Sequence, residues 1–102
     1  VCINADVKIG HHCIINTAST IEHDCVIEDF VHISPKASLA GNITVRKGAH
    51  VGIGANIIQG VTVGENALIG AGTVVLKDVP PNAVVVGNPG KIIKMKNSNN
   101  GE

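Results

Sequence analysis

The feature that most constrains this chain is a large aliphatic residue that recurs at every sixth position. The series has no gap between residues 3 and 75, and an apolar or small residue stands two positions before each member. Neither the 3.6-residue period of an amphipathic helix nor a two-residue alternation produces this spacing. A strict period of six is typical of a parallel β-helix, in which short strands wind around a stacked core. The members are Ile3, Ile9, Ile15, Ile21, Ile27, Ile33, Leu39, Val45, Val51, Ile57, Val63, Ile69 and Val75.

The same period predicts which residues become vertical neighbours. Three hexapeptides make one triangular coil of about eighteen residues, so residues eighteen apart lie above one another at the inter-strand spacing of about 4.8 Å. An unbroken series of this length predicts about four to five coils with no insertion. Glycines at positions 48, 54, 60 and 72 share one corner class, where a positive φ angle is easiest without a Cβ atom.

Composition fits one small domain and argues against several functions. Eight basic side chains balance eight acidic ones, so the chain lacks the basic field of a nucleic-acid-binding protein. Phe30 is the only residue of the Phe, Tyr and Trp group, which leaves no stacking platform for single strands. We expect neither membrane insertion nor secretion, and a cytoplasmic location, because no long apolar run or leader is present. We interpret Cys2, Cys13 and Cys25 as residues without chemistry, the latter two as small core fillers.

The end of the series marks the expected domain boundary. After Val75 the period fails at Pro80-Pro81. Because a solenoid end needs a cap and Val1 is already in register, we expect the chain to be the carboxy-terminal piece of a longer protein. The expected divisions are a β-helix over 1–79, a C-terminal extension over 80–96 with one extended stretch, a turn at 87–90 and a short basic tail, and a disordered tail over 97–102.

Five histidines make a metal site the first chemistry to weigh. His32 and His50 lie eighteen apart and should stack in one column, but no second pair has a matching spacing. Three convergent ligands are the minimum for a catalytic zinc site. We therefore expect no metal site from these residues. The other three histidines are His11, His12 and His23.

The triplet Glu22-His23-Asp24 is the sharper signal. The period places His23 at an outward corner of the prism, and a neighbouring carboxylate can fix its tautomer and raise its basicity, as a general base near neutral pH requires. Gly41 lies eighteen residues further on, so a bare backbone N–H is expected beside the imidazole. A base next to a donor for a developing oxyanion is what acyl transfer needs. The alternative is a plain corner, with a solvated histidine and Gly41-Asn42 serving only as a turn.

Three stretches carry a resemblance to a known family. The run NTASTIEHDCVIEDFVHISPKASLAGN at 16–42, together with IGAGTVVLKDVP and VVVGNPGK, resembles the left-handed β-helix acyltransferases. In particular it resembles the branch that contains bacterial nucleotide-amino-sugar N-acetyltransferases and sialic-acid O-acetyltransferases. The resemblance runs from residue 1 to about residue 94. It implies an all-β fold, a single-stranded left-handed parallel β-helix with a short C-terminal extension. The left-handedness comes from the resemblance alone, since crossovers are usually right-handed.

The resemblance also implies roles for individual residues. A long pantetheine arm that lies along the prism would cross one residue per coil, as the spacing of Ile53 and Ala71 allows. Lys91 and Lys94 stay open between contacts to the coenzyme phosphates and a solvated basic tail. The implied roles are His23 as general base, Asp24 as the residue that polarises it, Gly41 as backbone donor to the acetyl carbonyl, His32, Gly41, Ile53 and Ala71 as coenzyme contacts, and Asn16 and Glu22 as substrate-binding residues.

The implied function is an acetyltransferase that moves an acetyl group from acetyl-coenzyme A to an amino or hydroxyl group of a sugar or nucleotide-sugar acceptor. Direct attack, no metal, and a homotrimer with its active sites between subunits are expected. Family members also carry an N-terminal Rossmann-like acceptor-binding domain that this sequence lacks, so the acceptor and the choice of N- or O-acetylation stay open. The alternatives are a small-metabolite acetyltransferase of the same fold and a non-catalytic trimeric scaffold.

Overall fold

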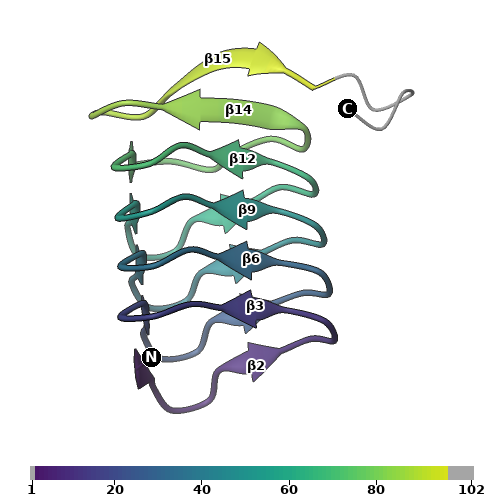
Figure 1. The fold of residues 1–102 in the computed structure, drawn as a ribbon, viewed down its shortest axis with the longest axis vertical. Helices are drawn as coiled ribbons and strands as arrows, with labels where there is room; N and C mark the ends of the chain where they lie inside the picture. Colours follow the sequence, from purple (N-terminus) through teal and green to yellow (C-terminus); the bar gives the residue numbers. More distant parts are fainter. Residues whose placement is uncertain (1, 97–102) are drawn as a thin grey trace.

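The computed structural model describes residues 2–96 and shows a stack of triangular coils (Figure 1). All of the regular structure in those residues is strand. No helix among them is long and apolar enough to cross a membrane. Residues 97–102, for which disorder was expected, lie outside the described residues.

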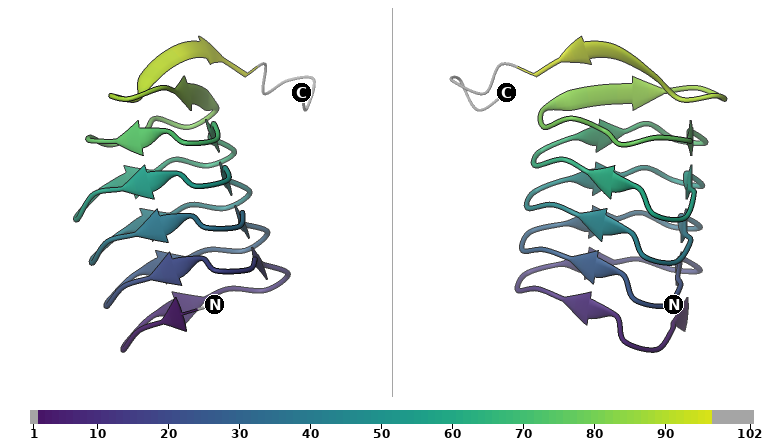
Figure 2. Two further views of the ribbon diagram at one scale, coloured as in Figure 1. Left: turned by 60° about the vertical axis from the view of Figure 1, so that its left-hand side comes forward. Right: turned by 180° about the vertical axis from the view of Figure 1, so that it is seen from behind.

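Three sheets form the sides of the prism, and Figure 2 shows them from two further directions. Sheet A contains β1 (Cys2–Ile3), β4 (Thr20–Ile21), β7 (Ser38–Leu39), β10 (Asn56–Ile57) and β13 (Val74–Val75). Sheet B contains β2 (Lys8–Ile9), β5 (Val26–Ile27), β8 (Thr44–Val45) and β11 (Thr62–Val63). Sheet C contains β3 (Ile14–Ile15), β6 (His32–Ile33), β9 (His50–Val51), β12 (Leu68–Ile69), β14 (Ala83–Val86) and β15 (Lys91–Met95).

The strand register confirms the predicted coil length. In sheet C, for example, His32 pairs with His50, eighteen positions later. The register changes at the top of the stack, where Val79 pairs with Val63 only sixteen positions earlier, and β14 keeps that offset against β12. The last coil is therefore two residues shorter, and the period breaks before Pro80 rather than at it.

The coil is left-handed, as the resemblance implied. With the chain rising from its N-terminal end, β3, β6, β9 and β12 run to the left at the front of Figure 1, while β2 of sheet B runs to the right behind them. A chain that rises in this sense turns against the usual right-handed crossover. The path of the chain therefore agrees with the left-handed coil that the family resemblance implied.

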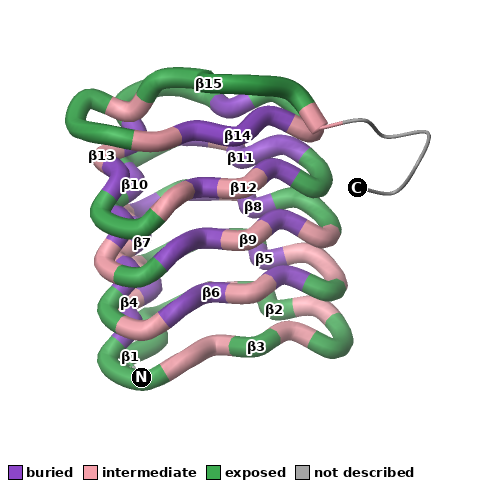
Figure 3. Tube along the Cα trace, turned by 45° about the horizontal axis from the view of Figure 1, so that its top comes forward, coloured by how far each residue is buried: buried purple, intermediate pink, exposed green. Residues whose placement is uncertain are grey.

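The aliphatic series fills the core, except at the N-terminal end. Inward residues from Ile21 to Ile69 are almost completely buried, and Figure 3 shows the buried segments repeating from coil to coil. In the first coil, however, Ile3 and Ile9 are 45% and 39% exposed. These two side chains lie at the bottom of the described stack, so one side of each has no neighbouring coil among residues 2–96.

Each corner is a two-residue turn whose second residue has a positive φ angle. This holds at every sixth residue from Asp6 to Gly72, with φ between 58° and 82°. Gly, Asn and Asp reach this region at low cost, which explains their frequency at the corners. We call the turns from sheet A to B corner AB, those from B to C corner BC, and those from C to A corner CA. His23 and Gly41 are first residues of such turns; His23 is exposed, whereas Gly41 is buried.

The segment after the coils is more regular than expected. The predicted extended stretch is β14, and the predicted turn lies at residues 87–90. The residues from Lys91 onward form β15, which pairs antiparallel with β14, so the expectation of a short basic tail there was wrong. β14 continues sheet C, and β15 adds the final strand at the top of the stack (Figure 1).

Candidate functional site

His23 and Gly41 are in contact at corner AB. The His23 ring lies against the Gly41 backbone so closely that a Cβ atom on Gly41 would be 2.6 Å from the ring Cε1 and 2.7 Å from Nε2. No side chain fits there unless the imidazole moves. The predicted vertical neighbours are therefore adjacent, and position 41 needs a glycine for the space that it leaves to the imidazole.

Asp24 holds the other side of the imidazole. Its Oδ2 atom lies 3.2 Å from His23 Nδ1, and each of the two side chains is 53% exposed. A carboxylate on Nδ1 favours the tautomer with the proton on that nitrogen, which leaves the Nε2 lone pair free to accept a proton. Asp24 is itself placed by its backbone, with a φ of 59° and an N–H that donates to Ala5 O in the coil below at 3.1 Å.

The Gly41 amide has no acceptor among residues 2–96, although its neighbours in the chain are paired. Ala40 N–H donates to Ile57 O, and Asn42 N–H donates to His23 O, both at 3.0 Å. Amides at the first turn position can bind oxygens from outside the ladder, because Lys47 N–H donates to Glu28 Oε1 at 3.1 Å. Corner AB therefore offers a proton acceptor and an unused amide donor side by side.

Glu22 points away from this donor. Its Oε1 atom accepts a hydrogen bond from Asn4 Nδ2, in the coil below, at 2.9 Å. Glu22 also borders a shallow hollow of about 340 Å³ on the outer face of sheet A, with Ser38 and Asn56 among the polar lining residues. Sequence reasoning missed Asn4, although its spacing of eighteen from Glu22 could have indicated the contact.

The remaining predicted residues gather elsewhere on the prism. Ile53 and Ala71 lie one above the other at corner CA, where Gly72 N–H donates to Ile53 O at 2.8 Å. Asn16 lies lower at the same corner, with its Oδ1 atom accepting from Thr17 N–H at 2.8 Å. The whole width of sheet A separates this group from His23, so one chain does not bring the two groups together.

His32 lies on the outer face of sheet C, stacked on His50 with 4.4 Å between ring centroids. Ser34 Oγ and His50 Nε2 are hydrogen-bonded at 3.0 Å. Burial, and then the neighbouring His32 and Lys96, lower the pKa of His50 below its ordinary value. Sequence reasoning foresaw the His32 and His50 column but not the contact with Ser34.

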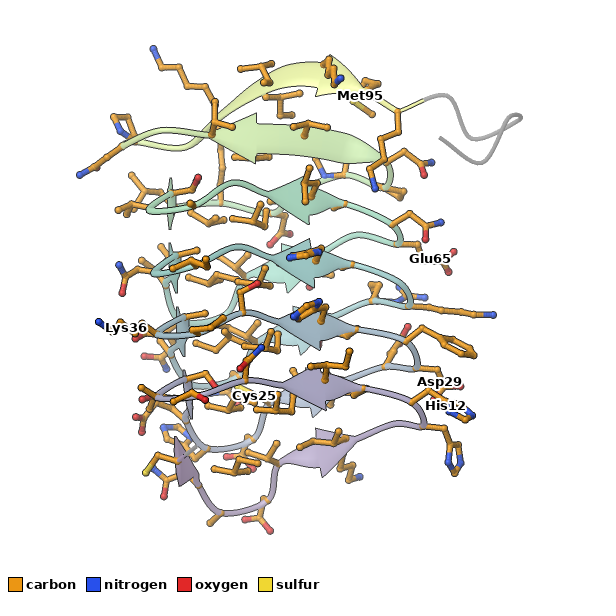
Figure 4. The ribbon with its side chains drawn as sticks, in the orientation of Figure 1. His12, Cys25, Asp29, Lys36, Glu65 and Met95 are labelled. Carbon is orange, nitrogen blue, oxygen red and sulfur yellow. The ribbon has the colours of Figure 1, made fainter. Side chains whose placement is uncertain are left out.

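Other residues from the sequence analysis are Cys25, which lies in the core, and Lys91 and Lys94, which lie on the surface. Cys25 is fully buried and points into the core in Figure 4; burial raises the pKa of its thiol, which keeps it protonated, as a core filler should be. Lys91 and Lys94 are exposed on β15. Among residues 2–96, no three His, Cys, Asp or Glu side chains are grouped to hold a metal ion.

Comparisons with known proteins agree with the resemblance, although no protein-family model matches the chain. The chain is 41% identical, with a TM-score of 0.89, to a mutant GDP-perosamine N-acetyl transferase from Caulobacter crescentus in complex with CoA and GDP-perosamine, over 90% of this chain and 44% of that one. It is also 41% identical, with a TM-score of 0.88, to the acetyltransferase domain of PglB from Neisseria gonorrhoeae in complex with acetyl coenzyme A, over 89% of this chain and 44% of that one.

A curated relative gives the same picture. The chain is 33% identical over 89 residues to the acyl-[acyl-carrier-protein]--UDP-N-acetylglucosamine O-acyltransferase of Gloeothece citriformis, which is 87% of this chain and 32% of that protein. The chain therefore spans about a third of this curated relative and less than half of each of the two solved structures described above. Over that span, its similarity to β-helix acyltransferases is confirmed in both sequence and fold.

Proposed function

We propose that corner AB is the chemical centre of an acetyltransferase that takes its acetyl group from acetyl-coenzyme A. The observation that carries the proposal is the contact of the His23 imidazole with Gly41, whose amide has no acceptor among residues 2–96. The similar proteins described above act on acyl donors, and two were solved with CoA or acetyl coenzyme A. A sugar or nucleotide-sugar acceptor is proposed because one of those structures also holds GDP-perosamine.

The proposed reaction is a direct attack on the thioester. His23 Nε2 takes the proton from the acceptor amine or hydroxyl as its nitrogen or oxygen forms a bond to the acetyl carbonyl carbon. The carbonyl oxygen becomes an oxyanion, to which Gly41 N–H donates. The C–S bond then breaks, and the leaving thiolate takes the proton from the His23 imidazolium, which restores the neutral base. Because a thiolate is a good leaving group, no strong general acid is required.

Asp24 has an orienting role in this scheme. It holds Nδ1 of His23, so that Nε2 faces the reaction and the imidazolium that forms is stabilised by a nearby negative charge. Because both side chains are half-exposed to water, the acceptor must supply part of the enclosure. The hollow beside Glu22, Ser38 and Asn56 is where we place the polar acceptor.

The second group of residues calls for a second copy of the chain. Ile53, Ala71 and Asn16 lie at corner CA, and His32 lies on the adjoining sheet C, so none of them reaches His23 of the same chain. We propose a homotrimer in which corner AB of one subunit faces corner CA and sheet C of the next. Ile53 and Ala71 would then border the pantetheine arm, and His32 would contact the coenzyme close to the thioester.

The test compares His23→Ala with His12→Ala, which removes a histidine at corner BC. We expect acetyl transfer to fall at least about a hundredfold in His23→Ala, the usual contribution of a general base, and to stay unchanged in His12→Ala. Acetyl-coenzyme A should raise the melting temperature of both variants, since binding to the folded state is linked to stability. Unchanged turnover in His23→Ala would remove this residue from the mechanism. No thermal shift at saturating coenzyme would favour the scaffold alternative.

A further inference from the structure

Corner BC shows how a glutamate side chain can bind the backbone amide of a neighbouring turn. At corner BC, Glu28 Oε1 accepts from Lys47 N–H at 3.1 Å and from Arg46 Nε at 3.0 Å. Arg46 lies in the coil above Glu28, so this pair draws the carboxylate upward, onto the first amide of the next turn. The turn amide at Lys47 is thereby occupied by a negatively charged acceptor.

Corner AB repeats this arrangement six residues earlier, with different side chains. In the same backbone geometry, Glu22 occupies the position of Glu28 and faces the same choice between the coil above and the coil below. The bond that corresponds to Glu28 with Lys47 N–H would join Glu22 to Gly41 N–H. The corresponding residues are Asn4 and Gly10, Glu22 and Glu28, Ala40 and Arg46, and Gly41 and Lys47.

The flanking side chains decide which way each glutamate turns. Above Glu22, Ala40 offers no donor, whereas below it Asn4 Nδ2 donates to Oε1 at 2.9 Å. Around Glu28 the order is reversed, because Gly10 below has no side chain and Arg46 above donates. Glu22 is therefore drawn down and away from Gly41, while Glu28 is drawn up and onto Lys47.

The direction matters because the Gly41 amide can serve only one strong acceptor. A carboxylate on that N–H would form a charge-assisted hydrogen bond, and it would also repel the negative charge that develops on a thioester oxygen. We propose that Asn4 is a positioning residue, which keeps the Gly41 N–H available for the acetyl carbonyl by holding Glu22 on the coil below. This rests on the proposed function, since it assigns Gly41 as the oxyanion donor.

The first test reads the amide directly, without substrate. In a ¹⁵N-labelled protein, Asn4→Ala should move the Gly41 amide proton downfield, as capture by a carboxylate requires, and Ala40→Arg should do the same by drawing Glu22 upward. The Lys47 amide is the internal standard, because Glu28→Ala should move it in the opposite direction. Cys2→Ala is the matched control in the same first coil and should leave Gly41 unchanged. A Gly41 signal that does not respond to Asn4→Ala would overturn the proposal.

The second test is a double-mutant cycle on acetyl transfer. Asn4→Ala should lower kcat roughly tenfold, the factor for occupying a donor with one charge-assisted bond, and should change the KM for acetyl-coenzyme A less than kcat. In the Glu22→Ala background, Asn4→Ala should have no further effect, since no carboxylate remains to be captured. An equal loss in both backgrounds would contradict a role through Glu22.

The two tests separate this inference from the proposed function. If His23→Ala retains full turnover, the catalytic assignment is wrong, and the amide signals still decide where Glu22 goes. If His23→Ala is inactive while Asn4→Ala leaves both the Gly41 signal and kcat unchanged, the proposed function stands and the role of Asn4 is refuted.

Discussion

Corner AB and corner BC share one backbone, yet the equivalent amides of Gly41 and Lys47 are used in opposite ways. At corner BC the chain itself occupies the amides of His11 and Lys47: Asp29 Oδ1 accepts from His11 N–H at 2.7 Å, and Glu28 accepts from Lys47 N–H. At corner AB the amide of Gly41 has no acceptor among residues 2–96, and a histidine lies over it. Figure 4 shows the labelled side chains of Asp29 and His12 clustered at the edge of corner BC.

The repeated backbone places a similar amide at each corner, and a few side chains decide whether that amide is bound within the chain or left for a ligand. Asp29 occupies the position at corner BC that His23 occupies at corner AB. At corner BC the glutamate, the arginine and the aspartate satisfy the corner and stabilise it. At corner AB the corresponding positions hold Glu22, which turns to the coil below, Ala40, which has no donor side chain, and His23. The amide of Gly41 therefore has no acceptor among residues 2–96. An unused amide in a buried residue costs stability, and at Gly41 this amide lies beside a histidine that can act as a base.

The largest expected difference between the corners comes from adding one methyl group. Gly41→Ala places a Cβ atom on the His23 ring, so the imidazole must swing away and acetyl transfer should fall at least about a hundredfold. Lys47→Ala, at the matching position of corner BC, should leave the rate within about twofold, because no reacting group lies beside it. Steady-state kinetics measure both, with thermal melting to show that both variants fold. Equal rates in the two variants would contradict the special status of corner AB.

A smaller difference is expected in stability, and here corner BC should be the more sensitive. Glu28→Ala removes acceptors for Arg46 Nε and Lys47 N–H, which should lower the free energy of unfolding by about 1 kcal/mol. Glu22→Ala removes only the contact with Asn4 and should cost about half as much. Urea denaturation at several protein concentrations measures both changes. A larger loss in Glu22→Ala would mean that corner AB, not corner BC, supports the coil.

The smallest expected effect is a pH dependence of the free energy of unfolding. It comes from sheet C and not from corner AB or corner BC. The pKa of His50 is lowered from 6.5 in the folded protein, first by burial and then by His32 and Lys96. Below pH 6.5 the unfolded chain therefore binds more protons at this histidine than the folded chain does. The free energy of unfolding should fall as the pH drops from 6.5 through the folded pKa of His50, and it should not change above pH 6.5. His50→Gln should flatten this slope in pH-dependent denaturation. An unchanged slope would show that another group titrates.

The period of six predicts the stacked coils and the vertical pairs of residues in the candidate site. Once residues eighteen apart are stacked, His23 and Gly41 must be neighbours, and so must Ile53 and Ala71, without any knowledge of side-chain conformation. The period of six could not predict β15, because the residues from Lys91 onward lie outside the repeat and pair antiparallel with β14. Nor could spacing tell which way Glu22 turns, since this depends on a balance between Asn4 and Ala40 in two other coils.

The most direct test of the account is a crystal structure with acetyl-coenzyme A, or with a thioether analogue that keeps the carbonyl group. If corner AB is the chemical centre, the acetyl oxygen accepts a hydrogen bond from Gly41 N–H, with His23 Nε2 facing the side from which the acceptor attacks. A thioester bound away from corner AB, or a carbonyl oxygen held by another donor while Gly41 N–H stays unused, would contradict it.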